Sequence, residues 1–204
     1  MIRIIDYGLG NVQAFLTMFK IIGVNAKLAQ TSADLNDASK IILPGVGAFD
    51  QAIQLLNRSG MRESLEKLVL LEKVPVLGVC VGMQILASSS DEGDLPGLGW
   101  LPGRVNSFRL NKCSSNLAIP HMGWNDVEAK LNHPLFSGLE RNARFYFLHS
   151  YYFECTNSDY IAATASYGFN FSCAVSKENI YGVQFHPEKS HLFGTRLIKN
   201  FTEL

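Results

Sequence analysis

The composition of this chain fits a globular domain and excludes several other classes of protein. Its 204 residues suit a single domain, which we expect to span residues 1–204, and they suffice to bury a sizeable core. Because 18 basic residues balance 18 acidic ones, the chain has no excess of positive charge to drive binding to nucleic acid or anionic lipid.

Targeting signals and disulfide patterns are not evident either. The apolar start at residues 1–6 is too short for a signal peptide, and no run approaches the ~20 apolar residues that a membrane span requires. The four cysteines, Cys80, Cys113, Cys155 and Cys173, show no paired spacing that would indicate a disulfide framework. We therefore expect a soluble protein of the reducing cytoplasm.

Apolar runs alternate with amphipathic segments in the first half of the chain. Strands are expected at residues 2–5, 24–29, 40–43 and 76–79, and helices at residues 11–22, 48–56, 61–71 and 82–86. Such alternation is typical of a mainly parallel sheet that is covered by helices on both faces. The periodicity therefore predicts the α/β class.

Short β-like runs dominate the second half, after a polar loop at residues 88–97. Strands are expected at residues 104–108, 144–148, 160–165, 171–176 and 180–185, the last two as a hairpin, and a final helix at residues 190–201. We expect Phe145, Phe147 and Tyr152 in the core or on a sheet face, and His133 in a surface loop. This half predicts an antiparallel β extension.

A cysteine between two glycines is the first chemical signal. Gly78-Val79-Cys80-Val81-Gly82 closes a predicted strand and opens a predicted helix, and the glycines leave room for a sharp turn. A cysteine at a helix N-terminus is favoured as a thiolate, the reactive form. Free cysteines are more often small buried hydrophobes, however, so the motif alone leaves both interpretations open.

A histidine near a glutamate supplies the second signal. His186-Pro187-Glu188 follows the predicted strand at residues 180–185, and the carboxyl ends of strands in such sheets are where ligands gather. Glu188 could accept a hydrogen bond from His186 and so orient the other ring nitrogen toward Cys80. A zinc site with His191 is the rival interpretation, but no second group of ligands at a recognisable spacing completes it, so we expect no metal.

These residues carry a resemblance to a known family. The stretch from Gly78 to Gln84 reads G-x-C-x-G-x-Q, and Phe185 to Glu188 reads F-H-P-E. Both patterns resemble the signatures of the class I (triad) glutamine amidotransferases. Further likeness to the glutaminase subunits of this family runs nearly end to end, through DYGLGN at 6–11, PGVG at 44–47, PHMGWN at 120–125, FYFLHSY at 145–151 and GVQFHPEKS at 182–190.

The resemblance implies a fold, a reaction and a set of site residues. The fold is a three-layer α/β/α domain of the flavodoxin-like type, and the reaction is hydrolysis of L-glutamine to glutamate and ammonia by Cys80, His186 and Glu188, without a cofactor. Oxyanion donors are expected at Val46, Gly47 and Val81, although a Gly-rich loop alone would be an ordinary turn. Substrate contacts are expected at Gly45, Gln84, His149, Ser150 and Tyr151.

The resemblance also implies a partner. Ammonia is protonated and lost in water, so a shielded route to a second active site is an advantage, and the related glutaminases pair with a (β/α)₈-barrel cyclase in histidine biosynthesis. We therefore expect a heterodimer in which the isolated glutaminase is weakly active. The positions associated with that interface are Asn11, Met122, Trp124, Tyr146 and Lys189, although Trp124 could equally be buried in the monomer.

Three other functions compete with this one. A paralogous glutaminase could supply ammonia for amidination of a surface-polysaccharide sugar. The features of the glutaminase subunit could look identical in both cases. An unrelated thiol hydrolase or cysteine peptidase could use a similar turn, but Gln84 argues against it. A non-catalytic regulatory scaffold would not need Cys80, His186 and Glu188 together.

Overall fold

The computed structural model describes residues 1–111 and 117–204, and in these residues strands outnumber helices. The strands are β1 (Ile2–Ile5), β2 (Ala26–Ala29), β3 (Lys40–Gly45), β4 (Val76–Cys80), β5 (Ser89–Ser90), β6 (Gly103–Ser107), β7 (His121–Asp126), β8 (Glu128–Ala129), β9 (Arg144–His149), β10 (Tyr151–Cys155), β11 (Ile161–Tyr167), β12 (Phe169–Lys177) and β13 (Ile180–Val183). The α-helices are α1 (Val12–Ile21), α2 (Phe49–Arg58), α3 (Arg62–Glu66), α4 (Val81–Gln84) and α5 (His191–Glu203).

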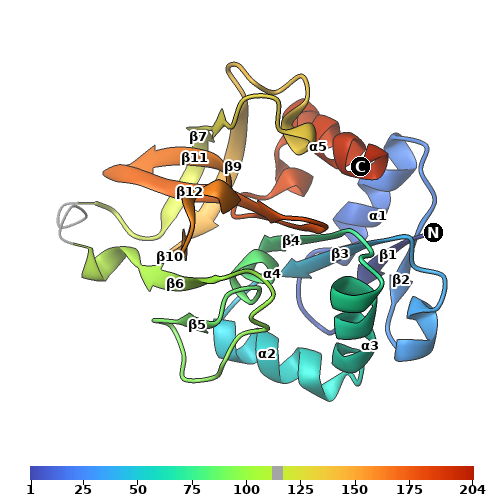
Figure 1. Cartoon of the computed structure of the whole chain (residues 1–204). Helices are drawn as coiled ribbons and strands as arrows, with labels where there is room; N and C mark the ends of the chain where they lie inside the picture. The colour runs from blue at the N-terminus through green and yellow to red at the C-terminus, as the bar shows by residue number, and fades with distance from the viewer. Residues whose placement is uncertain (112–116) are drawn as a thin grey trace.

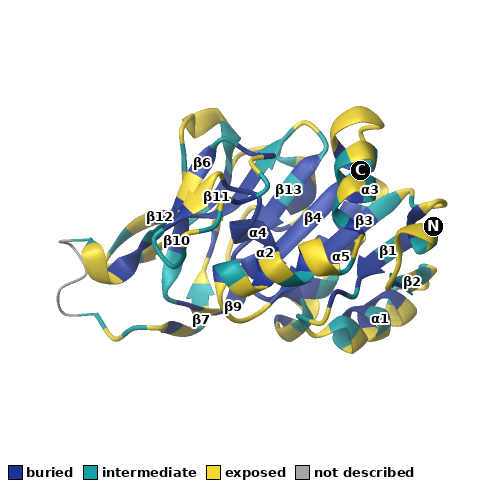
Figure 2. Cartoon of the chain, turned by 90° about the horizontal axis from the view of Figure 1, so that it is seen from below, coloured by how far each residue is buried: buried dark blue, intermediate teal, exposed yellow. Residues whose placement is uncertain are grey.

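The larger of two sheets runs through the centre of the molecule (Figure 1). Its order is β2-β1-β3-β4-β13-β12-β10-β6-β5, and the part from β2 to β13 is parallel. Helices α1 and α5 cover one face of this parallel part, and α2 and α3 cover the other (Figure 1). The predicted three-layer α/β/α architecture is therefore confirmed, and the central strands are the most deeply buried (Figure 2).

The second half forms the predicted antiparallel extension. Strands β12 and β13 pair as the expected hairpin, with Lys177 opposite Ile180, and β10 and β6 continue the sheet beyond β12. Strands β7 and β9 form a separate antiparallel sheet in which Met122 pairs with Leu148 and Trp124 with Tyr146. No helix in the described part of the chain is long and apolar enough to cross a bilayer.

Several local predictions differ from the structure. Strands β7 and β10 were not expected, since β7 (HMGWND) contains glycine and polar residues rather than the branched residues typical of strands. The helix expected at residues 82–86 is the shorter α4, because Leu86 N–H bonds to Met83 C=O and tightens the chain into a turn. His133 lies in a loop but is half-buried, with its ring packed near Phe136 and Tyr181.

Stacked phenylalanines join the small sheet to the large one. The ring of Phe145, on β9, lies 3.9 Å from the ring of Phe185 between centroids, and both side chains are fully buried. Phe185 directly precedes His186, so this packing also supports the segment that carries the predicted base. Buried aromatic pairs of this kind stabilise a fold both through the apolar area they remove from water and through the preferred arrangement of their rings.

We expect Phe145→Ala to destabilise the fold by about 3–5 kcal/mol, because it leaves a cavity between the two sheets. Urea unfolding followed by circular dichroism measures the loss. The matched control is Leu131→Ala, since Leu131 is 79% exposed, and that change is expected to cost less than about 0.5 kcal/mol. Equal losses in both variants would contradict this account of the interface between the sheets.

Candidate active site

Cys80 sits on a strained turn between β4 and α4. Its φ of 55° is unusual for a residue with a side chain and costs on the order of 1–3 kcal/mol, which the surrounding packing must offset. Gly82 makes the turn possible, because a Cβ there would overlap the carbonyl oxygen of Leu43. A Cβ on Gly78 would likewise lie 2.5 Å from the carbonyl oxygen of Gly82. Both glycines therefore serve close packing, as the motif predicts.

His186 and Glu188 meet Cys80 from the neighbouring strand. Strand β13 pairs in parallel with β4, Val183 opposite Val79, so the residues that follow both strands lie at one sheet edge. His186 Nδ1 lies 2.8 Å from Glu188 Oε1, and the side chains are only 4% and 3% exposed. The ring also hydrogen-bonds Cys80. Sulfur, imidazole and carboxylate thus form one connected group.

The charge state of His186 follows from these contacts. Burial lowers the pKa of the ring, but the hydrogen bonds to Cys80 and Glu188, together with their negative charges, outweigh burial and raise the pKa to about 10. His186 is therefore an imidazolium at neutral pH. An imidazolium beside a sulfur stabilises a thiolate, the nucleophilic form of cysteine.

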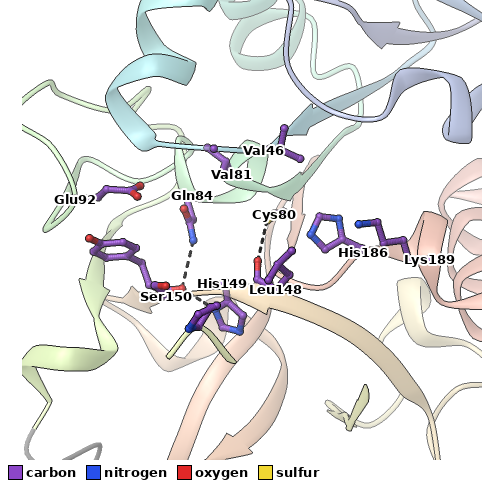
Figure 3. A pocket seen from close by; sticks show the side chains of 13 residues that line it. Val46, Cys80, Val81, Gln84, Glu92, Leu148, His149, Ser150, His186 and Lys189 are labelled. Carbon is purple, nitrogen blue, oxygen red and sulfur yellow. Dashed lines mark hydrogen bonds between the residues drawn. The ribbon is translucent and has the colours of Figure 1, made fainter. Parts of the chain in front are cut away.

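A cavity of about 270 Å³ opens beside this group (Figure 3). Most of the residues predicted for the site lie on its wall, and Figure 3 shows them converging from several elements of the fold. The predicted residues on the wall are Val46, Gly47, Cys80, Val81, Gln84, His149, Ser150, Tyr151, His186 and Lys189. Glu92, Pro120 and Leu148 complete the lining without having been assigned a role from the sequence.

The loop after β3 borders the cavity next to Cys80. Val46 is 41% exposed, and Gly47 has a φ of +87°, a conformation that favours glycine. Gly45 packs closely beneath this loop, since a Cβ there would lie 2.5 Å from the backbone nitrogen of Gly82, and its expected substrate contact stays a prediction. The hydroxyl of Tyr7 donates to the Pro44 carbonyl at 2.8 Å and so anchors this loop.

Gln84 projects into the cavity from one turn beyond Cys80. Its amide nitrogen lies 3.3 Å from the carbonyl oxygen of Tyr151 and 3.0 Å from Oε1 of Gln184. Both amide hydrogens are therefore engaged. Gln184 is fully buried and directs its own nitrogen toward the sulfur of Cys80, at 3.7 Å. Gln184 stands next to the F-H-P-E motif, but no role was predicted for it.

A second residue without a predicted role, His121, lies behind His149. His121 Nδ1 and His149 Nε2 are 2.9 Å apart, and His149 Nδ1 lies 2.7 Å from the carbonyl oxygen of Tyr151. Burial lowers the pKa of His149 to about 3 and that of His121 to about 4, so both rings are neutral at physiological pH. Asn125 Nδ2 lies 3.2 Å from His121 Nε2 and completes a chain of hydrogen bonds that holds the wall.

Four of the five predicted interface residues share one surface beside the cavity mouth. On the two-stranded sheet, Met122 and Trp124 project to the same side as Tyr146 and Leu148, and Met122 is 66% exposed. Lys189 Nζ lies 5.6 Å from the centre of the Tyr146 ring. We call this surface, made of Met122, Trp124, Tyr146, Leu148 and Lys189, the ribbon face.

Asn11 and Trp124, two of the predicted interface residues, differ in their surroundings. Asn11 caps α1 by accepting a hydrogen bond from Ala14 N–H at 3.1 Å, a sufficient structural role for an exposed asparagine. Trp124 is 41% exposed and stacks on His191, with ring centroids 5.5 Å apart. The structure thus favours the exposed position for Trp124 over the buried one.

The structure also bears on the rival zinc interpretation and on the remaining cysteines. His191 stacks on Trp124, and no group of three His, Cys, Asp or Glu side chains in the described residues is arranged to hold a metal ion. Cys155 and Cys173 are free thiols whose pKa values burial raises, that of Cys155 to about 12. Cys113 lies outside the described residues.

Comparison with known proteins agrees with this architecture. A model of the family described as Glutamine amidotransferase class-I matches residues 3–204. The chain is 62% identical over 204 residues to the imidazole glycerol phosphate synthase subunit HisH of Bdellovibrio bacteriovorus, and 50% identical to that of Leptospira borgpetersenii, with 100% of each chain covered. A solved glutamine amidotransferase superposes with a TM-score of 0.77 at 20% identity, covering 98% of this chain and 97% of that one, which shows a shared fold.

We expect the high pKa of His186 to appear in the pH dependence of stability. Because the pKa rises from 6.5 to about 10 on folding, the protonated ring stabilises the fold fully below pH 6.5, and this contribution is lost as the pH rises through about 10. Urea unfolding across that interval should show a falling free energy of unfolding in the parent protein and a shallower fall in Glu188→Gln. Parallel profiles would refute the proposed charge coupling.

Proposed function

The chain belongs to the class I glutamine amidotransferase family, and on that premise we propose that it is the glutaminase subunit of an imidazole glycerol phosphate synthase in histidine biosynthesis. Family membership confirms the predicted enzyme class. The observation that carries the proposal is the meeting of Cys80, His186 and Glu188 at the cavity that Gln84 and the loop after β3 also line.

The first step is attack of the Cys80 thiolate on the side-chain amide carbon of glutamine. The carbonyl oxygen gains negative charge, and backbone N–H groups of Val46 or Gly47 and of Val81 are the donors on the adjacent wall. His186 then protonates the departing nitrogen, so that ammonia leaves and a γ-glutamyl thioester remains on Cys80.

In the second step His186 acts as a base, whereas in the first step it acts as an acid. When the thioester forms, the sulfur carries no charge, and one cause of the raised pKa of His186 is removed while burial continues to lower it. The ring that has given its proton to ammonia therefore remains neutral and accepts a proton from water. Hydroxide attack on the thioester releases glutamate and restores the thiolate.

The remaining wall residues suit the α-amino and α-carboxylate groups of glutamine. Both hydrogens of the Gln84 amide are engaged, so Gln84 presents its carbonyl oxygen as an acceptor for the ammonium group. Ser150 and Tyr151 line the same space. We infer that these groups, with His149 holding the Tyr151 carbonyl, bind the amino-acid end of the substrate.

The partner we propose is a (β/α)₈-barrel cyclase that uses the ammonia to make imidazole glycerol phosphate and AICAR. The ribbon face supports this assignment, since it exposes Met122 and Trp124 beside a cavity whose wall includes Leu148 and Lys189. Aromatic and apolar anchors of this kind dominate protein interfaces. Docking there would cover the cavity mouth and keep ammonia from water.

We expect Cys80→Ala to lower ammonia release from glutamine by at least about 10³-fold, because the covalent route is removed. A coupled glutamate dehydrogenase assay measures the rate. The matched control is Cys155→Ala, since Cys155 is a half-buried thiol away from the cavity, and it should retain turnover. Full turnover by Cys80→Ala would eliminate the nucleophile assignment.

We also expect the isolated chain to release ammonia slowly and a co-expressed barrel cyclase to stimulate it. Trp124→Ala should weaken binding of the partner by about 2 kcal/mol, roughly 30-fold in Kd, because an exposed aromatic anchor is lost. Titration of the partner with ammonia release as readout gives the Kd, and Leu131→Ala serves as the surface control. Equal affinity of both variants would place the interface elsewhere.

A further inference from the structure

Gln184 combines complete burial with contacts to two groups of the active site. The side chain is 0% exposed, accepts a hydrogen bond from Gln84 at 3.0 Å and directs its nitrogen to Cys80 Sγ at 3.7 Å. A buried amide must have its polar atoms paired to be tolerated, so a glutamine is not expected at such a position without a purpose. Leucine or methionine would fill the same space without that requirement.

The backbone carbonyl of Tyr151 fixes the orientation of the Gln84 amide and, through it, that of the Gln184 amide. A carbonyl oxygen only accepts, so the atom of Gln84 that lies 3.3 Å from it must be the amide nitrogen. That nitrogen also faces Gln184 at 3.0 Å and requires an acceptor there, which is Oε1 of Gln184. The nitrogen of Gln184 is then the atom that points to the sulfur of Cys80. The direction of every hydrogen bond in the series is thereby assigned.

We propose that Gln184 is a further functional residue of the glutaminase reaction, whose side-chain amide stabilises the thiolate of Cys80 and holds Gln84 in its binding orientation. The inference rests on the proposed function. An N–H donor favours a thiolate over a thiol, because hydrogen bonds to a charged acceptor are stronger. The carbonyl oxygen of Leu148 has the opposite effect and favours the thiol. It lies 3.9 Å from the sulfur and can accept a hydrogen bond only from the protonated form.

Other charged and titratable groups around the sulfur act in addition to Gln184. His186 approaches from the segment after β13 and has Glu188 behind it, and Tyr7 approaches from the end of β1. Glu92 and Lys189 lie on the cavity wall. A change confined to Gln184 leaves all of these in place, so its effect on the thiolate is separable from theirs.

The test is the pH dependence of Cys80 alkylation by iodoacetamide, followed by mass spectrometry of the peptide that contains Cys80. Gln184→Met keeps the volume and removes the donor. We expect the whole alkylation profile to move to higher pH by about one unit, so that the rate on its rising limb falls by up to about tenfold while the high-pH plateau stays unchanged. The KM for glutamine should rise as well, because Gln84 loses its acceptor.

The matched control is Gln54→Met, which makes the same chemical change on the exposed surface of α2. Its alkylation profile should coincide with that of the parent protein. A Gln184→Met profile that also coincides with the parent would overturn the proposal. Alkylation needs no turnover, so this failure is distinguishable from failure of the proposed function, which Cys80→Ala tests through ammonia release.

A measurement on the unchanged side chain covers the case in which Gln184→Met does not fold. The side-chain amide of Gln184 should shift in ¹⁵N-resolved NMR spectra with the same midpoint as the alkylation profile, because it donates to the titrating sulfur. In Cys80→Ser that shift should disappear. An amide resonance that does not respond to the titration of Cys80 in the parent protein would equally overturn the proposal.

Discussion

The parallel pairing of β4 with β13 is the contact on which the rest of the site depends. It sets Gly78 opposite Gly182 and Val79 opposite Val183, so that the chain segments leaving both strands emerge at one edge of the sheet. One segment carries Cys80 and the other carries His186. Neither strand has room for bulk here, since a Cβ on Gly78 would lie 2.5 Å from the carbonyl oxygen of Gly82, and one on Gly182 would lie 2.7 Å from the Met83 side chain. Close packing of backbone on backbone thus creates the geometry that the chemistry uses.

Strand β9 connects this site to the molecular surface. Its Tyr146 accepts a hydrogen bond from His186 N–H at 2.9 Å, and its own N–H donates to the hydroxyl of buried Ser190 at 3.0 Å. The same strand contributes Leu148 to the ribbon face and ends at His149 on the cavity wall. A partner that displaced β9 would therefore move His186, the surroundings of the Cys80 sulfur and the substrate wall together. Docking of a partner could regulate the active site through these contacts.

Features that depend on residues close together in the sequence were predictable, and features that depend on contacts between distant segments were not. The parallel half of the sheet and helix α5 were predictable because their apolar periodicity is strong and local. Strand β7 was not, because its residues are not typical of strands and it exists through pairing with β9. In the site, Gln84 was predictable from its spacing of one turn from Cys80, whereas the contact of Gln184 with that sulfur depends on two strands meeting.

The linear order of residues was enough to establish the family and the α/β class and to propose the reactive groups, because glycines around Cys80 and the F-H-P-E motif are local features with local physical meaning. Folding in three dimensions was needed to reveal which buried donors face the sulfur, how Tyr151 orients two hydrogen-bond series, and how closely Gly45 packs against the backbone of Gly82. These features join residues up to 104 positions apart, and hydrogen bonds at that separation leave no periodic trace in a sequence.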